Sequence, residues 1–323
     1  MGKTVFAIVN PRAASYLAGR KWQHIRREIM AAGFEVTGRF TEHKYHAVEL
    51  AREACSRNAD IILSVGGDGT FNEIVNGVMS RNCPADRRPV LGIVSVGTGS
   101  DFARTLGLTG DYRAAVRAMI RGKPRFCDVG FVRFTIGGRT KTRYFANVFD
   151  VGLGGNVVRI ANFVPKNLGG FLTFLLSSLA GLATFKPPRL RIDIDGEHAD
   201  TGLITIVGCA NGQYFGGGMN IAPMARLDDG RLEVLYVKDT NLFRFVRRVL
   251  MPVYKARHLG YERLFHRPCR RVLITGQRVF VCDVDGEEEK AEKVEVTLVD
   301  RAIRILSPLP RSSTTQKKPE ILR

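Results

Sequence analysis

The first 127 residues alternate between short apolar runs and segments of helical spacing, and this alternation restricts the fold more than any other feature of the chain. Strands that alternate with helices form a parallel sheet whose two faces the helices cover. The sequence therefore predicts an α/β domain at the N-terminus. We expect its strands at 5–9, 34–40, 61–67 and 91–97, and its helices at 20–32, 46–57, from Phe71 and around 111–121.

After Asp128 the pattern changes to frequent β-runs, which indicate a mostly antiparallel second domain. A chain of 323 residues also exceeds the ~100–200 residues usual for one domain. We expect an α/β domain at 1–128, a β-rich domain at 129–306, and a polar, basic tail at 307–323 that frays or packs back on the first domain. The β-runs lie at 131–136, 144–149, 189–194, 203–208, 232–237, 271–276, 279–284 and 293–299.

The chain is strongly basic: 49 Lys and Arg residues against 31 Asp and Glu residues give a net charge of +18. Such an excess indicates a polyanionic partner, which a nucleic acid, a membrane surface or a nucleotide would each satisfy. The six cysteines are scattered without a C-x-x-C pair, so we expect reduced thiols of a cytoplasmic protein. Residues 3–10 are typical of a first strand rather than of a secretory signal peptide, which also favours a cytoplasmic location.

Residues 167–185 carry no charge and lie between Lys166 and Lys186. As a helix of 19 residues the segment would span about 28 Å, close to the ~30 Å of the hydrocarbon core of a bilayer. Its glycine, serine and threonine residues argue against a membrane span, and so do the β-runs on both sides, which must share one sheet. We expect a helix that is buried or that touches a membrane.

Residues 241–271 contain nine Arg or Lys residues and one acid, Glu262. Basic side chains alternate with apolar ones at helical spacing, which is typical of an amphipathic helix on a membrane surface. An ordinary solvated basic face would give the same pattern, and Pro252 limits how far one straight helix can continue. The apolar positions are Leu242, Phe245, Val249 and Val253, and the basic ones between them are Arg244, Arg247, Arg248 and Lys255.

The segment 61–73, IILSVGGDGTFNE, is a buried strand that runs into a glycine turn and then a helix. Glycines let the backbone come within hydrogen-bonding distance of a phosphate, and the start of a helix adds its free N–H groups. Asp68 in this turn would act near the phosphates through Mg²⁺ or a bound water. The turn matches neither the Walker motif nor the dinucleotide motif, and a glycine turn capped by an aspartate is the simpler alternative.

A second glycine turn follows the strand run at 91–97, and the first strand ends in a polar turn at Asn10. Because the carboxyl ends of parallel strands meet at one edge of a sheet, these turns should lie together where ligands of α/β proteins bind.

Five motifs follow one another along the chain: GGDGT with Asn72 and Glu73, GTGSDFAR at 97–104, FCDVG at 126–130, GGGMNIAPMARLDDG at 216–230 and VDGE at 284–287. Together these segments resemble the catalytic domain of the diacylglycerol kinase family, in particular the bacterial soluble lipid kinases. The resemblance implies a Rossmann-like α/β domain of the NAD kinase and diacylglycerol kinase type, followed by an antiparallel, β-sandwich-like domain. GGDGT also occurs in NAD kinases and in sphingosine and ceramide kinases, so the segment at 216–230 is the more specific.

The resemblance also implies roles for individual residues. Glu287 would be the general base, with Asp68 as a second catalytic residue, and Asp229 would form a structural Mg²⁺ site with the backbone carbonyls of Arg226 and Arg231. A base is needed because an alcohol with a pKa of about 16 is a poor nucleophile until its proton is accepted. The residues implied to bind ATP are Asn10, Thr41, Gly66, Gly67, Asp68, Gly69, Thr70, Glu73 and Thr98.

The residues alone leave simpler alternatives open at three of these places. The LDDG segment around Asp229 is also typical of a type I turn, and Asp285-Gly286 is typical of a hairpin turn. Glu287 begins the run EEEK, which is otherwise typical of a solvated loop, and Thr41 by itself would be an ordinary hydroxyl at a strand end.

The chain departs from the family pattern at three places. Ser100 stands where the family usually has Asn, Arg12 to Ser15 replace a glycine-bearing first turn, and Met224 replaces a more polar residue. None of these changes touches Asp68, Asp229 or Glu287.

We therefore expect an ATP- and Mg²⁺-dependent lipid kinase that phosphorylates a hydroxyl of a membrane lipid, most readily diacylglycerol to phosphatidic acid. A sphingoid or ceramide kinase, an NAD kinase-like enzyme and a non-catalytic nucleic-acid binder are the alternatives. The expected partner is an anionic membrane surface rather than nucleic acid, and the expected location is the cytoplasm with peripheral membrane association. A homodimer is compatible with the sequence, which does not determine the oligomeric state.

Overall fold

The computed structural model describes residues 2–81, 83–96, 100–108, 112–161, 181 and 185–308, and all structural statements below concern these residues. Three parts of the sequence prediction lie outside them: Thr98, most of the uncharged stretch at 167–185, and the tail beyond residue 308.

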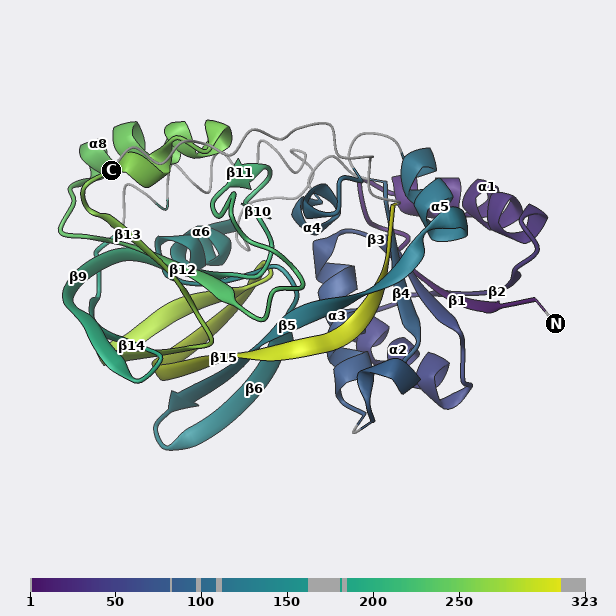
Figure 1. Cartoon of the computed structure of the whole chain (residues 1–323), viewed down its shortest axis with the longest axis horizontal. Coiled ribbons are helices and arrows are strands. Elements are labelled where there is room, and N and C mark those ends of the chain that lie inside the picture. The colour runs from purple at the N-terminus through teal and green to yellow at the C-terminus, as the bar shows by residue number, and fades with distance from the viewer. Residues whose placement is uncertain are drawn as a thin grey trace.

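The elements are arranged in two parts that lie side by side (Figure 1). The helices are α1 (Leu17–Ala31), α2 (His46–Ser56), α3 (Asp68–Met79), α4 (Asp101–Thr105), α5 (Tyr112–Arg121), α6 (Leu153–Ala161) and α8 (Leu242–Phe245), with a π turn at Val246–Leu250 and 3-10 turns at Ala85–Arg87, Pro252–Lys255 and His258–Gly260. The strands are β1 (Thr4–Val9), β2 (Glu35–Phe40), β3 (Ile61–Gly66), β4 (Val90–Ser95), β5 (Lys123–Ile136), β6 (Arg139–Phe145), β7 (Val148–Gly152), β8 (Arg189–Ile194), β9 (Glu197–Ala210), β10 (Tyr214–Phe215), β11 (Met219–Asn220), β12 (Leu232–Lys238), β13 (Leu264–Cys269), β14 (Arg271–Val284) and β15 (Glu287–Ser307).

The N-terminal part is the predicted α/β domain. Its strands β2, β1, β3 and β4 lie in that order and are all parallel. Alternate residues of each strand face opposite helices: Phe6 and Ile8 of β1 pack with α2 and α3, whereas Ala7 and Val9 pack with α1 and α5 (Figure 1). Because the strands are parallel, the segments that follow β1, β2, β3 and β4 emerge at the same edge.

The C-terminal part is antiparallel and closes around one core. The strand order is β13-β12-β9-β7-β14-β15, and β8 pairs with both β9 and β14, the same two strands that flank β7. This double pairing curls the strands around a core that includes Phe145, Phe149 and Val207. The two parts together are the predicted fold class, an α/β domain followed by a β-sandwich-like domain.

Two long strands connect the two parts. β15 pairs with β14 at its start and with β5 over most of its length, and Ile305 near its end pairs with Leu91 of the parallel strand β4. Val296 accordingly belongs to the core of the β-rich part and Ile305 to the core of the α/β part. The strand bends at an irregularity between Val299 and Ile303.

The structure corrects several details of the strand prediction. The single run expected at 144–149 is two strands, because the N–H groups of Ala146 and Asn147 bond to the carboxylate of Asp285 and not to a neighbouring strand. The two runs at 271–276 and 279–284 are one strand with a bulge. β13 was not predicted, since its sequence LFHRPC lacks a β pattern, and Pro268 is tolerated there because β13 lies at the edge of the sheet.

The basic stretch at 241–271 is not one amphipathic helix. α8 ends after one turn, a π turn follows, and a 3-10 turn begins at Pro252. The predicted sidedness is nevertheless present, since Phe245, Val249 and Val253 are buried. Within the described residues, no helix has the length and apolar character that crossing a bilayer would require.

The connection made by β15 predicts a stability effect. Ile305 is 2% exposed, and replacing it with alanine leaves a cavity in the core of the α/β part. We expect Ile305→Ala to lower the free energy of unfolding by about 2–4 kcal/mol in urea denaturation. The control is Val279→Ala on β14, where the side chain is 49% exposed and the loss should be small. Equal losses for the two variants would contradict the assignment of Ile305 to that core.

Candidate active site

The glycine turn after β3 has an open backbone. At Gly67 and Gly69 an added Cβ would meet nothing within 4 Å, and neither residue has a positive φ. At Gly66, by contrast, a Cβ would lie 2.8 Å from the Thr70 hydroxyl oxygen. The fold therefore requires a glycine at 66, whereas at 67 and 69 the bare backbone leaves space for something that approaches from outside. The Asn10 side chain donates to the Thr70 hydroxyl at 3.1 Å and so ties the end of β1 to this turn.

The carboxylate of Asp68 joins the glycine turn after β3 to the start of α4. It accepts the backbone N–H of Asp101 at 2.7 Å and that of Phe102 at 3.3 Å, which are free N–H groups of the first turn of α4. Burial, together with the negative charge of Asp101, raises the pKa of Asp68 to about 7. The side chain expected beside the phosphates therefore also fixes the start of α4 against the turn after β3.

Glu73 caps another helix. Its two carboxylate oxygens accept the N–H groups of Tyr45 and Ala47, each at 3.1 Å, at the start of α2. Burial raises its pKa, and the charge of Glu287 acts in the same direction. Glu73 thus anchors the loop after β2, which carries Thr41, and it lies near the candidate base.

Asp101 is a functional candidate to which the sequence reasoning gave no role. Its carboxylate accepts the N–H of Gly217 at 2.7 Å, and the guanidinium of Arg104 lies 3.8 Å away. Burial raises its pKa. Gly216, Gly217 and Gly218 have φ values of 61°, 82° and 106°, a region that favours glycine, so the GGG motif permits this contact. The sequence could have indicated Asp101, because an acidic residue that directly follows a glycine-rich segment and begins a helix is a candidate for a functional role.

Asp285 holds the hairpin that presents Glu287. It is partly buried, and it accepts the side-chain N–H of Asn72 on α3 at 2.7 Å and the backbone N–H of Val148 at 2.9 Å. Asp285 and Gly286 have φ values of 48° and 90°, as expected for the hairpin turn between β14 and β15. The hairpin turn that Asp285-Gly286 suggested is therefore present, and it is compatible with Glu287 as the general base, because it places Glu287 directly after the turn.

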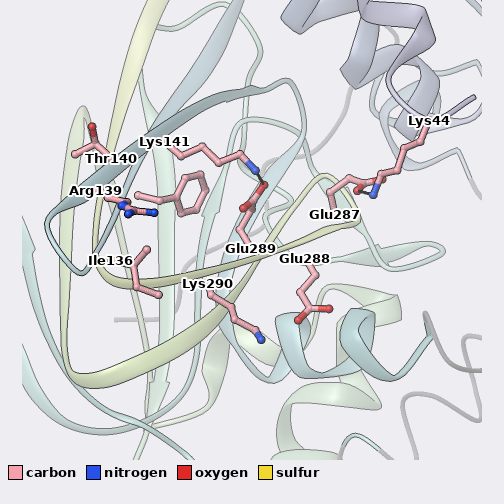
Figure 2. A pocket seen from close by; sticks show the side chains of 10 residues that line it. Lys44, Ile136, Arg139, Thr140, Lys141, Glu287, Glu288, Glu289 and Lys290 are labelled. Carbon is pink, nitrogen blue, oxygen red and sulfur yellow. Dashed lines mark hydrogen bonds and ion pairs between the residues drawn. The ribbon is translucent and has the colours of Figure 1, made fainter.

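Glu287 faces the α/β part from the first position of β15. Its carboxylate forms an ion pair with Lys44, which lies on the loop between β2 and α2 (Figure 2). Both residues line an open groove of about 480 Å³. The groove lies between the β5–β6 and β14–β15 hairpins and is lined by Lys44, Phe134, Ile136, Arg139, Thr140, Lys141, Glu287, Glu288, Glu289 and Lys290.

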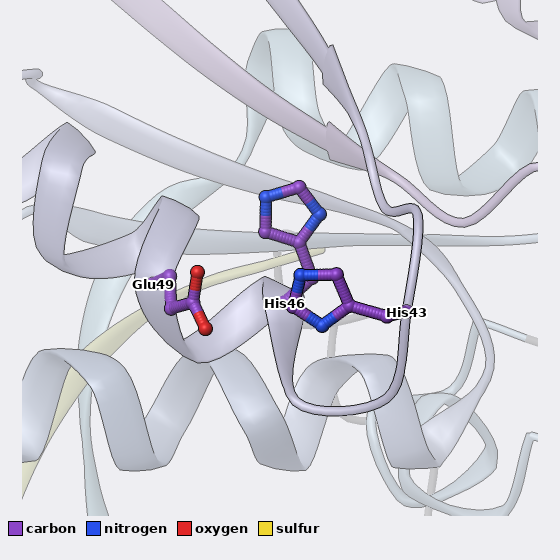
Figure 3. A group of neighbouring side chains, drawn as sticks. All are labelled: His43, His46 and Glu49. Carbon is purple, nitrogen blue, oxygen red and sulfur yellow. The ribbon is translucent and has the colours of Figure 1, made fainter.

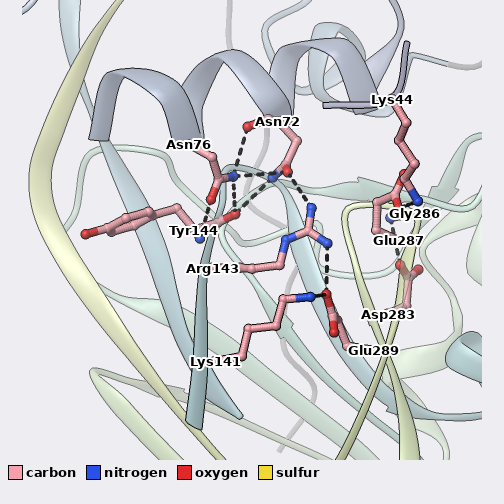
Figure 4. Close-up of polar contacts among 10 residues, drawn as sticks. All are labelled: Lys44, Asn72, Asn76, Lys141, Arg143, Tyr144, Asp283, Gly286, Glu287 and Glu289. Atoms are coloured by element: carbon pink, nitrogen blue, oxygen red, sulfur yellow. Dashed lines mark hydrogen bonds and ion pairs between the residues drawn. The ribbon is translucent and has the colours of Figure 1, made fainter. Parts of the chain in front are cut away.

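A polar network supports the same interface (Figure 4). Arg143 of β6 contacts the Asn72 side chain at 3.4 Å and Glu289 at 3.3 Å, and Lys141 contacts Glu289 at 2.5 Å. Asn76 donates to the backbone carbonyl of Tyr144 at 2.9 Å. These contacts fix α3, which follows the glycine turn, against the strands beside the groove.

The other implied residues are placed as follows. Thr41 directly follows β2 at the carboxyl edge, and its N–H donates to the carbonyl of Val9 at 2.9 Å. Asp229 lies in an exposed turn, where it accepts the N–H of Arg231 at 3.2 Å. Burial raises the pKa of Asp229, and the charges of Glu233 and Asp228 raise it further. An acidic turn with oxygen donors suits a hard cation such as Mg²⁺.

The turn around Asp229 is held by a buried acid. Asp128 accepts the N–H of Gly230 at 2.8 Å and that of Arg301 at 2.7 Å, where β15 bends. The FCDVG motif therefore has a structural role, which is to join the Asp229 turn to both long strands. The Arg226 guanidinium lies 3.7 Å from Asp228.

The turn after β1 has backbone angles that favour glycine at three residues that are not glycine. Ala14, Ser15 and Tyr16 have φ values of 53°, 55° and 70°, in the region that favours glycine. Each such residue costs on the order of 1 kcal/mol, which agrees with the expectation that a glycine-bearing turn would be usual here.

Among the residues that the structure describes, the group of three side chains best spaced for a transition metal is His43, His46 and Glu49 (Figure 3). The two rings are stacked with an interplanar angle of 10°, and Nδ1 of His46 accepts the N–H of Glu42 at 3.0 Å. Because the lone pairs of stacked rings lie in parallel planes, they do not converge on one ion. His46 acts here as a backbone acceptor.

Comparison with known proteins agrees with this geometry. Residues 4–132 match the model of the diacylglycerol kinase catalytic domain, and residues 147–307 match the YegS C-terminal NAD kinase beta sandwich-like domain. A diacylglycerol kinase of Bacillus subtilis is 29% identical over 93% of this chain and 95% of its own length. A diacylglycerol kinase of Staphylococcus haemolyticus is 27% identical over 95% of this chain and 89% of its own length.

Solved structures share the fold. The crystal structure of a diacylglycerol kinase from Bacillus anthracis covers 95% of this chain and 97% of its own, with a TM-score of 0.67 and 21% identity. Yeast NADH kinase in complex with NADH covers 98% of this chain and 90% of its own, with a TM-score of 0.54 and 12% identity.

The open backbone of the glycine turn gives a prediction. Gly69→Ala adds a methyl group that touches nothing in the protein and favours the helix, so the melting temperature should stay the same or rise. If a nucleotide phosphate approaches this backbone, the variant should bind ATP at least tenfold more weakly in calorimetry. Gly260→Ala is the matched control, since it also meets open space without a positive φ, far from this turn in the chain. Unchanged ATP affinity in Gly69→Ala would remove this turn from the nucleotide site.

Proposed function

The chain belongs to the diacylglycerol kinase family and is a kinase that uses ATP, and on this premise we propose that it phosphorylates a hydroxyl group of a membrane lipid, converting diacylglycerol to phosphatidic acid. The observation that carries the proposal is the position of Glu287, a carboxylate in an open groove that faces the loops of the α/β part.

The nucleotide side of the reaction rests on the glycine turn. The exposed backbone at Gly67 and Gly69 lets phosphates approach the start of α3, where free N–H groups and the positive end of the helix stabilise negative charge. Asn10, Thr41 and Thr70 lie at the same edge and offer polar groups to the rest of the nucleotide. Phosphoryl transfer depends mainly on such positioning and on neutralising charge.

The acceptor side rests on the groove. A lipid hydroxyl within hydrogen-bonding distance of Glu287 would lose its proton to the carboxylate as its oxygen bonds to the γ-phosphorus. Ile136, which is 38% exposed, gives the groove apolar surface for the part of the lipid beside the hydroxyl. Arg139 and Lys290 line it as well, so the groove also suits the charged surface of a bilayer.

Mg²⁺ fits the acidic character of the site. Asp68 lies near Asp101 and Asp285, whose negative charges each raise its pKa. A divalent cation brought with ATP would relieve this repulsion and neutralise the phosphates. Asp229 is the residue we propose for a second, structural Mg²⁺, together with the backbone of Arg226 and Arg231.

An anionic membrane surface is the partner we propose for the stretch that follows β12. Its outer side exposes three large apolar residues, Phe243 at 72%, Met251 at 68% and Tyr254 at 51%. Exposed arginines lie beside them, and Arg247 and Arg248 line a hollow of about 340 Å³ in which a lipid phosphate would find charge-assisted donors. Tyr254 also lies near enough to Asp101 for that charge to raise its pKa, so this surface borders the active site.

The role of Glu287 gives the central prediction. Glu287→Gln keeps the shape of the side chain but cannot accept a proton, so kcat for diacylglycerol phosphorylation should fall by about 10²–10⁴-fold. The assay follows labelled phosphate from ATP with Mg²⁺ into vesicles that contain diacylglycerol, ceramide or a sphingoid base, and in parallel into NAD.

Glu295→Gln is the matched control, a glutamate of the same strand whose partners, Arg133 and Arg271, lie on the surface. It should leave the rate unchanged. Full activity of Glu287→Gln would exclude it as the base. Phosphorylation of NAD without that of any lipid would overturn the proposed substrate class.

The membrane surface gives a separate prediction. Vesicle sedimentation should show a preference for anionic over neutral lipid that weakens as salt is added, because exposed charges are screened over ~8–10 Å. Arg247→Ala/Arg248→Ala should remove the preference, and Phe243→Ser/Met251→Ser should weaken binding to both kinds of vesicle. Val279→Ser, which alters an exposed apolar residue of β14, should do neither. Binding of the unaltered protein that is equal for neutral and anionic vesicles would contradict the proposal.

A further inference from the structure

Lys44 lies between the nucleotide loops and the candidate base. It follows Thr41 by three residues on the loop that leaves the carboxyl end of β2. The N–H of Thr41 bonds to Val9, and Glu73 accepts the N–H of Tyr45, so the loop is fixed on both sides of Lys44. The backbone of Lys44 is therefore held at a constant place relative to the glycine turn, while its long side chain stays free to change direction.

The side chain of Lys44 reaches across to the β-rich part. Its ammonium group forms an ion pair with Oε2 of Glu287, and the Lys44 side chain is 60% exposed while that of Glu287 is 28% exposed (Figure 4). The hydrogen bond to Glu287 raises the pKa of Lys44, so the ammonium group keeps its charge at neutral pH. Both residues line the groove. The pair is therefore a charged contact between the two parts, at the end of the groove where the acceptor hydroxyl must lie.

This ion pair would hinder Glu287 from acting as a general base. A carboxylate oxygen that is bonded to an ammonium group is occupied and is less available to the hydroxyl of an acceptor. Exposed ion pairs are weak, so a more highly charged anion nearby can displace Glu287 from Lys44. The terminal phosphate of ATP at the glycine turn would be such an anion, and it would lie at the same sheet edge as the loop of Lys44.

We propose that Lys44 changes partner with the state of the nucleotide site, binding Glu287 when no nucleoside triphosphate is present and the terminal phosphate when one is bound. The proposal rests on the proposed function for the positions of ATP and of the base. The change releases Glu287 for the acceptor hydroxyl only when a phosphoryl donor is in place, and it brings a positive charge to the group that is transferred. Lys44 is then a positioning residue for the base and a ligand of the γ-phosphate.

The exchange predicts a coupling that binding measurements detect without catalysis. If Glu287 competes for Lys44, removing its charge must strengthen the binding of a triphosphate, because coupling between two sites is reciprocal. An ion pair of this exposure corresponds to about a two- to fivefold change in affinity. A diphosphate lacks the terminal group, so its affinity should not change.

The experiment is a double-mutant cycle in calorimetry with the full chain, Mg²⁺ and either a non-hydrolysable ATP analogue or ADP. Glu287→Gln should bind the analogue about two- to fivefold more tightly. Lys44→Met should bind it at least fivefold more weakly and Lys44→Arg near normally. Adding Glu287→Gln to Lys44→Met should then have no effect. ADP affinity should stay within twofold throughout.

Lys238→Met is the matched control. Lys238 also forms an ion pair, with Asp200 at a distance of 2.6 Å, and neither residue lines the groove. It should change neither affinity. The proposal would be contradicted if Glu287→Gln changed the affinity for the analogue equally in the unaltered protein and in Lys44→Met. It would also be contradicted if Glu287→Gln changed the affinities for ADP and for the analogue equally. These outcomes are distinct from failure of the proposed function. That failure would appear as full lipid kinase activity of Glu287→Gln, or as an ATP affinity that Gly69→Ala leaves unchanged.

Discussion

The carboxylate of Asp68 accepts two backbone N–H groups from the start of α4, and the arrangement of the site depends on this contact. It brings the turn after β3 against the segment after β4, and it thereby places Asp101 where its carboxylate accepts the N–H of Gly217 in the β-rich part. Asp285 makes the equivalent link from the other side, through Asn72 of α3. The loops of the α/β part and the β-rich part are thus joined by partly or fully buried carboxylates that accept N–H groups, and not by apolar packing alone.

This use of acids has an electrostatic consequence. Burial raises the pKa of Asp68, Asp101 and Asp285, and the charges of Asp101 and Asp285 add to the effect at Asp68. Hydrogen bonds from N–H groups offset part of the cost of burying these charges. The remainder favours cations in the site: the guanidinium of Arg104 lies 3.8 Å from Asp101, and Mg²⁺ would add positive charge during phosphoryl transfer. An acid-rich centre is therefore compatible with a triphosphate substrate only when cations accompany it.

The sequence predicted the elements of the α/β part well, because buried parallel strands and amphipathic helices have strong local patterns. It predicted less well the strand and helix boundaries that are set by contacts between residues far apart in the chain. The split between β6 and β7 exists because Asp285 takes N–H groups at 146 and 147, and no local pattern contains that information. The basic amphipathic helix expected within 241–271 is an α-helix only as far as Phe245, although the buried positions Phe245 and Val249 followed the predicted spacing.

The candidate site shows the same division. The residues alone indicated the glycine turn, and the resemblance implied roles for Asp229 and Glu287. The caps made by Asp68 and Glu73 and the contact of Asp101 depend instead on which helix starts lie nearby. Lys44 had no signal at all, since a lone lysine in a short polar loop is ordinary. Its interest comes from a partner 243 positions further along the chain, Glu287, which only the folded structure brings to it.

The distribution of positive charge separates two partners that the composition alone could not. A nucleic acid and an anionic bilayer would both be attracted by Arg247 and Arg248, since each is a dense array of phosphates. Only the bilayer offers apolar depth, and the same surface exposes Phe243 and Met251, whose burial in water-free surroundings is favourable at about 25 cal/mol per Å². A nucleic acid would leave these side chains in water unless bases stacked on them, and Met251 offers no ring for stacking. The pairing of exposed apolar and basic residues therefore supports the membrane surface that we propose as the partner, over a nucleic acid.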